Sequence, residues 1–486
     1  MRIKRLARIT AWVIGGLVGL LFLLTAIALT TVDHTPYRAL PVVTNTLARL
    51  EQAKATNHLV YGELRAGFGR AKLTPTLGVE REAWTAGRFR SVPLAGYGAR
   101  KGKPATGVLQ DVWVKAVAFA VSGQTSVIVA AEALIIPRDV ADKAAHRLAE
   151  AKGLARELIY FNATHTHSSI GGWGQGYMAE QFAGPFVPGV PDWFAQQLAA
   201  AALAALDDLR PASLGHGSFA APEFVRNRLV GDAGTKDPTF TLMLVKQADG
   251  DQAVLGSYAA HGTVFSGSNM QFNGDYPGYW AAALEKAGYK LGMFVGGSVA
   301  SHGPRARKSG LEGAEQMGGA LADLAQKSLP HILLTNQLVF GIIGVEVPLP
   351  ELQVRLSDGI RLRPWLARAL LPAPSTFVQG LRLQNNLWLS APCDFSGELT
   401  LELKDQAKSR QVEIAVTSFN GDYVGYVIPS KYYHRDGYEP RLMSFYGPQL
   451  PDYLKDVLGG LVNVLAPSPE VHGELGPPNF GRTLDP

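Results

Sequence analysis

Residues 112–121 read VWVKAVAFAV, residues 126–136 read SVIVAAEALII and residues 157–165 read ELIYFNATH. These three stretches are apolar and rich in β-branched residues, which is typical of buried strands. Alanine-rich segments in which apolar residues follow the helical period occupy 138–151 and 192–206. Strands that alternate with helices predict an α/β fold, in which mixed sheets are covered by helices.

The same pattern continues along the chain and predicts one large domain. PTFTLMLVK at 238–246 and QAVLGSYAA at 252–260 are further strand-like segments. The chain has 486 residues, and a typical domain size of about 150 residues would allow roughly three domains. Because no internal repeat or low-complexity tract divides the sequence, we expect a single large α/β domain over residues 64–465.

Shorter segments flank the predicted domain. Residues 32–63 are expected to form a tether with a short helix at 44–54, where TNTLARLEQAK has apolar spacing near the helical period. Residues 466–486 form a Pro/Gly-rich tail. The single cysteine, Cys393, excludes an intramolecular disulfide framework and any multi-cysteine zinc or iron–sulfur site.

Residues 1–31 are expected to form a basic N-region and a transmembrane signal anchor. Four basic residues and no acid precede an uncharged stretch, residues 11–31, that is long enough to cross a bilayer, which takes about 20 helical residues. The basic residues are Arg2, Lys4, Arg5 and Arg8. Because positive residues stay on the cytoplasmic side, the rest of the chain is expected on the exported side, periplasmic or extracellular.

A cleaved signal peptide, which would give a secreted protein, is the alternative, with Ala26-Ile27-Ala28 as a weak cleavage site. The anchor is favoured because the apolar stretch exceeds the usual signal-peptide core of about 7–15 residues. The formal net charge is +5, and four of these charges lie in the N-region, so the domain itself is nearly neutral. It has no basic run with interleaved aromatic residues, which argues against nucleic acid as a partner.

Residues 358–390 combine arginines with a tryptophan and many leucines. One interpretation is an ordinary helix and strand packed on the domain. The other is a basic amphipathic lip that rests on a membrane interface. The residues that motivate the second interpretation are Arg361, Arg363, Arg368 and Trp365.

The strongest chemical signal is NATHTHSSIGG at 162–172, which follows a strand-like segment. At a strand end His165 and His167 would share the mouth where α/β sheets place their sites. Neutral imidazole is a good zinc ligand, and the neighbouring glycines let a substrate approach the backbone. His-x-His alone is a weak signal, because many histidines only cap or pack.

A second histidine repeats the pattern: His261 follows an apolar strand and precedes Gly262 and Thr263. A lone histidine is more often a satisfied core residue. Nearby Asp275 could orient a ligand by a hydrogen bond. Glu398 begins a predicted helix, where the helix dipole already accounts for a carboxylate.

Taken together, the ordered motifs resemble the neutral/alkaline (non-lysosomal) ceramidases. The resemblance runs from about Ala66 to the 460s, and ordered motifs over this length make chance agreement improbable. The motifs are AGFGRAKLTP, PLAGYGAR, THTHSSIGG, AAHGT, NGDYPGYW, PCDFSGELT, DYVGYVIPSKYYHRDGYEP and SFYGPQ.

The resemblance implies a zinc hydrolase domain over 64–465 that cleaves the amide of ceramide-like N-acyl lipids to a fatty acid and a free sphingoid base. In such a site zinc lowers the pKa of a water and polarises the amide carbonyl. His167 would lie beside the metal water and stabilise the oxyanion, and Arg228 and Tyr438 match further site residues. The implied Zn2+ ligands are His165, His261, Glu398 and Tyr426.

Two departures from the family pattern are visible. The family's catalytic serine, which precedes a proline, corresponds here to Gly303. Ser301 stands where the family has an aspartate and is taken as a candidate catalytic residue. Ser298 and His302 are nearby substitutes, and a zinc-water mechanism does not need the serine. The C-terminal immunoglobulin-like domain of longer members is expected to be absent.

Three functional interpretations therefore stay open. The first is a membrane-anchored zinc amidase that acts on ceramide or another N-acyl lipid, and the anchor would hold it where its substrate lies. The second is a hydrolase of the same fold with another amide or ester lipid as substrate, which the altered serine position motivates. The third is a degenerate, non-catalytic lipid-binding protein. Acyl-chain specificity and oligomeric state are not predicted.

Overall fold

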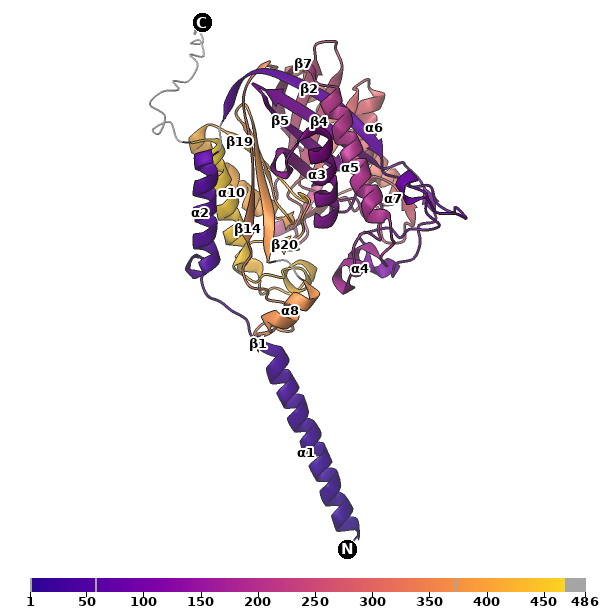
Figure 1. Cartoon of the computed structure of the whole chain (residues 1–486), viewed down its shortest axis with the longest axis vertical. Helices are drawn as coiled ribbons and strands as arrows, with labels where there is room; N and C mark the ends of the chain where they lie inside the picture. Colours follow the sequence, from indigo (N-terminus) through magenta and orange to yellow (C-terminus); the bar gives the residue numbers. More distant parts are fainter. Residues whose placement is uncertain (1, 57–58, 372–373, 468–486) are drawn as a thin grey trace.

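A 12-stranded mixed sheet is the framework of the protein (Figure 1). A computed structural model describes residues 2–56, 59–371 and 374–467. The main path of the sheet runs through β12 (Leu291–Gly296), β10 (Gln252–Tyr258), β9 (Thr239–Gln247), β7 (Arg210–Ala220), β2 (Val60–Lys72), β14 (Gln337–Pro348), β16 (Ser375–Leu383), β17 (Asn386–Ser390) and β19 (Glu413–Thr417). From β2 it branches into β4 (Trp113–Val121), β5 (Gln124–Ala131) and β6 (Ile159–Ala163).

The expected α/β class is confirmed, and so are the strands that the sequence predicts. The segments at 112–121, 126–136 and 157–165 form β4, β5 and β6, although β5 ends at Ala131. Their residues are buried on both faces, which is why they read as continuous apolar runs. The predicted helices are α3 (Arg138–Lys152) and α5 (Val190–Asp207).

Helices cover the outer faces of the sheet in three groups. The α3 and α5 pair packs over β2, β4 and β5. A second pair packs beside β12 and β7, and a third group packs over β14, β16, β17 and β19. The second pair is α6 (Asp275–Lys286) and α7 (Gly310–Ser328), and the third group is α2 (Pro41–Thr56), α9 (Gly397–Ala407) and α10 (Leu450–Leu465).

Glycine and alanine bring α5 unusually close to the sheet. A Cβ at Gly67 or Gly69 of β2 would lie 2.1 Å from the carbonyl oxygen of Ala205 or Ala201 of α5. Real atoms cannot approach so closely, so any larger residue at these positions would push the helix away from the strand. A buried apolar layer inside the curled sheet completes this core and includes Phe119, Tyr160, Met293, Phe340 and Trp388.

The carboxyl ends of three strands are tied together by one side chain. The Asn162 side chain at the end of β6 donates from Nδ2 to the carbonyl oxygens of Gly296 and Ser418, at 3.2 and 2.6 Å. Its Oδ1 accepts the backbone N–H of Gly296 at 2.7 Å. Gly296 ends β12 and Ser418 follows β19. Loops that leave these strands therefore start from one fixed point, which is where open α/β sheets place their sites.

The N-terminal apolar helix α1 (Arg2–Ala28) projects away from the domain (Figure 1). Its segment Arg8–Ala28 is long and apolar enough to cross a membrane and none of it is buried, which suggests a signal sequence or an anchor. The helix expected at 44–54 is α2, which packs against α10. Residues 32–63 are therefore docked on the domain over much of their length. Most of the predicted tail, from 468 to 486, lies outside the described residues.

Candidate metal centre

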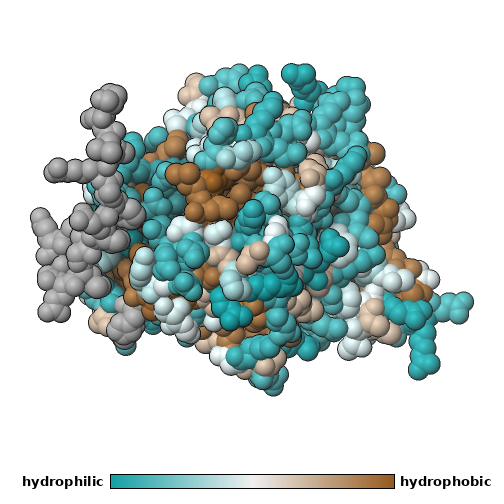
Figure 2. All heavy atoms as spheres, turned by 90° about the horizontal axis from the view of Figure 1, so that it is seen from above, coloured by the Kyte–Doolittle hydropathy of each residue, from teal (hydrophilic) through white to brown (hydrophobic). Residues whose placement is uncertain are grey.

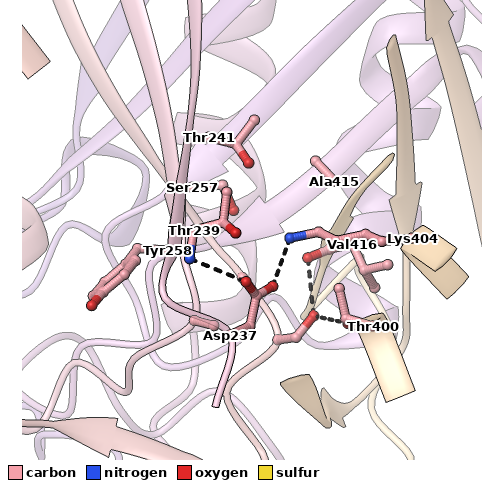
Figure 3. Close-up of a pocket in the computed structure, with 12 residues that line it drawn as sticks. Asp237, Thr239, Thr241, Ser257, Tyr258, Thr400, Lys404, Ala415 and Val416 are labelled. Atoms are coloured by element: carbon pink, nitrogen blue, oxygen red, sulfur yellow. Dashed lines mark hydrogen bonds and ion pairs between the residues drawn. The ribbon is translucent and has the colours of Figure 1, made fainter. Parts of the chain in front are cut away.

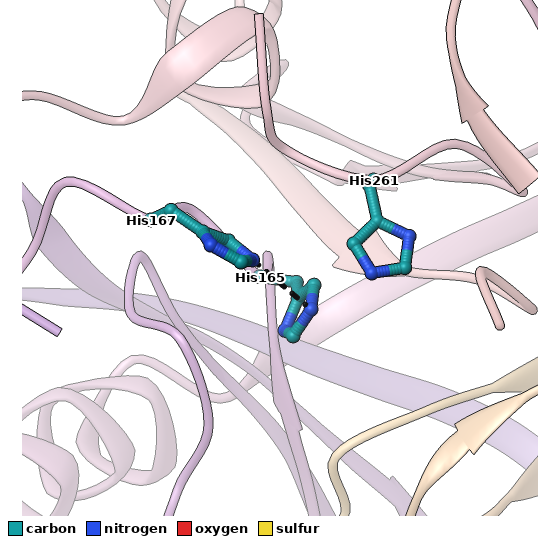
Figure 4. A group of neighbouring side chains, drawn as sticks. All are labelled: His165, His167 and His261. Atoms are coloured by element: carbon teal, nitrogen blue, oxygen red, sulfur yellow. Dashed lines mark hydrogen bonds between the residues drawn. The ribbon is translucent and has the colours of Figure 1, made fainter. Parts of the chain in front are cut away.

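Three histidines converge at the strand ends (Figure 4). His165 and His167 follow β6, and His261 follows β10. One ring nitrogen from each lies within 4.8 Å of the others, so the cluster could hold a metal ion. His165 and His261 are buried, and His167 is half-buried. The structure thus brings together all three histidines that the sequence singled out.

Backbone carbonyls set the orientation of two of these rings. Nδ1 of His165 lies 2.7 Å from the carbonyl oxygen of Leu134, and Nδ1 of His261 lies 2.9 Å from that of His302. A carbonyl oxygen only accepts hydrogen bonds, so each Nδ1 carries the proton. In the neutral ring Nε2 then keeps its lone pair, which is the usual arrangement of a metal-binding histidine.

Local backbone geometry holds the two histidine loops against each other. His165 has a φ of 63°, in the left-handed region that is costly for a residue with a Cβ. Its N–H donates to the carbonyl oxygen of Ala133 at 3.0 Å, which maintains this conformation. A Cβ at Gly262 would lie 2.7 Å from the carbonyl oxygen of His165, so only glycine permits this close approach.

Asp275 supports the loop that follows His261. Its carboxylate accepts the backbone N–H groups of Val264 and Phe265 at 3.2 and 3.0 Å. Burial raises the pKa of Asp275 to about 6 despite these hydrogen bonds. The role that the structure supports for Asp275 is therefore to shape the loop next to the histidine.

A fully buried carboxylate, Asp394 of β18 (Asp394–Phe395), completes the group. Its Oδ1 lies 3.3 Å from Nε2 of His165 and 3.1 Å from Nε2 of His261. Its Oδ2 accepts a hydrogen bond from the Tyr423 hydroxyl at 2.8 Å. Burial raises the pKa of Asp394, whereas positive charge at His165 and then at His261 lowers it, and the lowering is the larger effect.

Three electron-pair donors therefore face one another. Both Nδ1 atoms are committed to carbonyl oxygens, which leaves two Nε2 atoms and the Oδ1 of Asp394 pointing into one space. Neutral imidazole lone pairs would repel a carboxylate oxygen unless a cation or a proton lies among them. A metal ion with a preference for nitrogen and oxygen ligands meets this requirement, and the donor set fits one.

Tyr426 and Arg228 extend the site on the side of His261. The Tyr426 hydroxyl lies 3.0 Å from Nε2 of His261 and accepts a hydrogen bond from Arg228 at 3.0 Å. Arg228 also forms an ion pair with Glu439, with Nε 2.9 Å from Oε1. The ring of Tyr438 contacts that of Tyr426 edge-on, with a centroid distance of 5.7 Å. Four residues from three segments therefore form a chain of contacts that ends at His261.

Two short ladders account for these positions. β18 pairs in parallel with β20 (Tyr426–Val427), and their register sets Asp394 directly opposite Tyr426. Arg228 follows β8 (Val225–Asn227), which pairs with β13 (His302–Pro304). The carbonyl of His302, which orients His261, comes from this second ladder.

The structure brings Glu398 and Ser301 into other contacts. Glu398 lies at the start of α9, where Oε1 accepts a hydrogen bond from Asn227 and Oε2 forms an ion pair with Lys431. The hydroxyl of Ser301 pairs with that of Ser396 at 2.8 Å. The carboxylate in contact with the histidines is Asp394, four positions before Glu398 in the same PCDFSGELT motif.

The position of the missing serine adjoins Arg228. A Cβ at Gly303 would lie 3.5 Å from Cδ of Arg228, which is ordinary contact distance. The two substitutes that the sequence offers have other partners. Ser298 bonds to Thr400, and Nε2 of His302 accepts the backbone N–H of Asp237 at 3.2 Å.

A small polar cavity lies beside these residues (Figure 3). Asp237 and Lys404 form an ion pair of 2.7 Å across it, and Ser298 also lines it. Its volume of about 20 Å³ is enough for roughly one water molecule. Such a cavity satisfies buried polar groups and is too small for a substrate.

Comparison with known proteins gives these residues a context. Residues 76–302 match the family described as neutral/alkaline non-lysosomal ceramidase, N-terminal. The solved structure of neutral ceramidase from Pseudomonas aeruginosa is similar, with 18% identity, a TM-score of 0.67 and coverage of 83% of this chain and 74% of that chain. A ceramidase complexed with C2 is similar at 17% identity and a TM-score of 0.68, covering 86% of this chain and 77% of that chain.

No curated protein matches the chain by sequence. The two solved structures share its fold at low identity, and the family match spans all three histidines of the cluster. Residues 76–302 thus match the neutral/alkaline ceramidase family, and the chain has the fold of the solved ceramidase structures.

Proposed function

We propose that this protein is a zinc-dependent amidohydrolase that cleaves the N-acyl bond of ceramide or a related N-acyl lipid. The observation that carries the proposal is the convergence of three electron-pair donors, Nε2 of His165, Nε2 of His261 and Oδ1 of Asp394, in which the carboxylate oxygen lies 3.3 and 3.1 Å from the two nitrogens. The family match suggests an amidohydrolase, and a ceramide-like lipid is the substrate that the family implies.

The proposed ligands for Zn2+ are His165, His261, Asp394 and Tyr426. Asp394 replaces Glu398 in the set that the sequence suggested, because Asp394 contacts both histidines and Glu398 contacts Asn227 and Lys431. Nitrogen and oxygen ligands of this kind are typical of catalytic zinc. When bound, the metal lowers the pKa of a water molecule and polarises the amide carbonyl.

His167 is the proposed proton carrier. Burial lowers its pKa well below the ordinary value, and the nearby His165 and His261 lower it further. The ring is therefore neutral at pH 7. Nε2 lies 3.3 Å from Nε2 of His165, and the buried Nδ1 has no hydrogen-bond partner. A neutral ring beside the reacting atoms can accept a proton from the attacking water and return it to the leaving nitrogen.

Arg228 is the proposed stabiliser of the oxyanion. Glu439 and the Tyr426 hydroxyl hold the guanidinium at one end of the chain of contacts that leads to His261. A cation that is already positioned where negative charge develops loses little reorganisation energy during the reaction. Tyr438, whose ring contacts Tyr426, lies at the exposed end of the same chain and is proposed to contact the substrate.

The direct test is zinc-dependent release of fatty acid. The purified full-length protein is incubated with an N-acyl sphingosine, before and after chelation, and zinc is then added back. We expect chelation to abolish release and zinc to restore it. His146 is an exposed histidine of α3 outside the cluster. The variant His146→Ala should therefore lose release on chelation and regain it with zinc as the wild type does. Release that persists after chelation would overturn the proposal.

The glycine at position 303 favours a second candidate function, hydrolysis of an ester lipid. An ester carbonyl is more electrophilic than an amide carbonyl, so a site without the family serine could be restricted to it. The same assay with matched ester and amide substrates decides between the two functions. A kcat/KM that falls to background for the amide while the ester is cleaved would select the ester.

A further inference from the structure

The apolar helix α1 leads directly into the folded domain. Strand β1 (Leu29–Thr31) starts where α1 ends and pairs antiparallel with β15 (Ile360–Leu362). The next residue, Arg363, donates its backbone N–H to the carbonyl oxygen of Ala28 at 2.8 Å. Its side-chain Nε donates to the carbonyl oxygen of Ala26 at 3.1 Å. The end of α1 is thus hydrogen-bonded to the domain, without a free linker.

This junction sets the depth of the neighbouring residues if α1 spans a bilayer. Its apolar segment Arg8–Ala28 has 21 residues, which at about 1.5 Å per residue span roughly 31 Å. The hydrocarbon core of a bilayer is about 30 Å thick. Ala28 then lies at the outer boundary of the core, and every residue close to Arg363 lies at the level of the lipid headgroups.

Segments joined to Arg363 through β15, through α8 and through the ion pair of Arg441 with Asp358 expose apolar and basic side chains, which we call the membrane-proximal face. It consists of Leu356, Ile360, Arg363, Trp365, Arg368, Leu370 and Leu442. Trp365 is 58% exposed and Leu442 is 63% exposed, values that are unfavourable in water for side chains of this size. Tryptophan is enriched at membrane interfaces, and arginine can pair with lipid phosphates.

Arg368 of this face and its neighbour Arg361 have an acidic partner in the domain. The carboxylate of Glu351 forms ion pairs with both guanidinium groups, with Oε2 3.1 Å from Arg361 and Oε1 3.7 Å from Arg368. Arg368 nevertheless keeps 66% of its side chain exposed. Figure 1 shows helix α8 (Pro364–Leu370) beside β1, at the end of the domain from which α1 leaves. The opposite end, seen in Figure 2, is largely hydrophilic around separate apolar areas.

The membrane-proximal face is connected to the candidate metal centre. Arg441 forms an ion pair of 2.8 Å with Asp358, which joins the loop before β15 to the single π-helical turn Tyr438–Leu442. That turn carries Leu442 on the face and Tyr438 at its other end. Since Tyr438 contacts Tyr426 next to His261, this turn links the surface to the histidines.

We propose that the membrane-proximal face rests in the outer leaflet of the bilayer that α1 crosses, and that it holds the Tyr438 side of the metal centre at the lipid surface. A lipid substrate then reaches the site from the leaflet without passing through water. The docking requires that α1 is not cleaved off and crosses the bilayer. The delivery of substrate rests also on the proposed function, so the two are tested separately.

Docking is tested with single-cysteine labels on the full-length protein in phosphatidylcholine vesicles. Cys393 is buried, so an introduced cysteine is the reactive one. An environment-sensitive fluorophore is attached at Leu370→Cys and, as a control, at Tyr61→Cys, which is exposed at the start of β2. We expect blue-shifted emission and quenching by nitroxide-labelled lipids at position 370 alone. Equal, unquenched emission at both positions would overturn the docking, whether or not the protein hydrolyses lipids.

Delivery is tested with Trp365→Ala, which lies outside the metal centre. We expect a several-fold loss of kcat/KM for a long-acyl N-acyl sphingosine embedded in the vesicles. The same variant should cleave a water-soluble short-acyl substrate at the wild-type rate. Equal loss on both substrates, or no loss on either, would overturn delivery, whereas absence of all hydrolysis in the wild type would overturn only the proposed function.

Discussion

The candidate metal centre is built from two regions of the chain that differ in how readily they can be recognised. The region matched by the family, 76–302, contributes His165, His167 and His261. The region after it contributes Asp394 and Tyr426, which meet through a two-residue ladder. The first region is held by long strands of the central sheet and the second by short local pairings. The histidines of the first region can therefore be recognised in the sequence, whereas the carboxylate of the second region cannot.

The physical reason lies in the competition among residues of the same type. The chain has 11 histidines and 41 acidic residues. A histidine directly after a buried strand therefore has few rivals, whereas a carboxylate has many. Glu398 was proposed as a ligand through the family resemblance, but at the start of α9 its carboxylate contacts Asn227 and Lys431. Asp394 had one usable signal, its place in a PCDF run shortly after a predicted strand.

The largest expected effect comes from the histidine side of the comparison. His261→Ala should reduce amide hydrolysis to background and lower zinc content, because it removes one of the two ring nitrogens that face Asp394 in the proposed zinc site. The measurement is fatty-acid release together with metal analysis of the same sample. If His261→Ala hydrolyses the amide at the wild-type rate, His261 is not part of the catalytic site.

A large effect is also expected at Arg228, which joins the two regions through Glu439 and Tyr426. Arg228→Lys keeps the charge but loses the two-pronged contact, so kcat should fall by about 10²–10³ with little change in KM. Arg226→Lys, an exposed neighbour on β8, is the matched control and should leave kcat unchanged. A change confined to KM would instead assign Arg228 to substrate binding.

A smaller effect tests the second region. Tyr423→Phe removes the hydroxyl that donates to Oδ2 of Asp394, and zinc affinity should fall by about 10–100-fold. Tyr160→Phe is the matched control, because its buried hydroxyl bonds to Thr417 within the core. Zinc affinity is measured by competition with a chelator. Equal losses in both variants would mean that general destabilisation is the cause.

The smallest effect is expected at Glu398. Glu398→Gln retains the hydrogen bond from Asn227 and loses an ion pair with Lys431, whose side chain is largely exposed. Exposed ion pairs contribute about 0–1 kcal/mol, so thermal unfolding should change little and hydrolysis should be preserved. Loss of hydrolysis with an unchanged unfolding temperature would restore Glu398 to the catalytic site.

Much of the fold could be predicted from the sequence, because local patterns determine it. β4, β5 and β6 are apolar on both faces, and α3 and α5 follow the helical period. The docking of residues 32–63 could not be predicted, since it depends on contacts between distant segments. The side chain of Gln353, for example, accepts the backbone N–H of Asp33 and donates to the backbone carbonyl oxygen of Asp33. No local pattern signals such a contact.

The same distinction applies to the site. His165 and His261 could be identified because each follows a strand. Tyr426 and Arg228 could be identified only through the family resemblance. The partners Tyr423 and Glu439 were missed, because a tyrosine or a glutamate beside a strand usually has a packing or surface role. Only the three-dimensional arrangement shows that Tyr423 holds Asp394 and that Glu439 holds Arg228.

The zinc content of two variants in one motif tests the central claim most directly. Asp394→Asn and Glu398→Gln are expressed as full-length protein, shown to be folded by circular dichroism, and analysed for zinc by mass spectrometry. We expect Glu398→Gln to retain zinc as the wild type does, about one ion per chain for a mononuclear site, and Asp394→Asn to lose most of it. Zinc retained in Asp394→Asn and lost in Glu398→Gln would contradict the account.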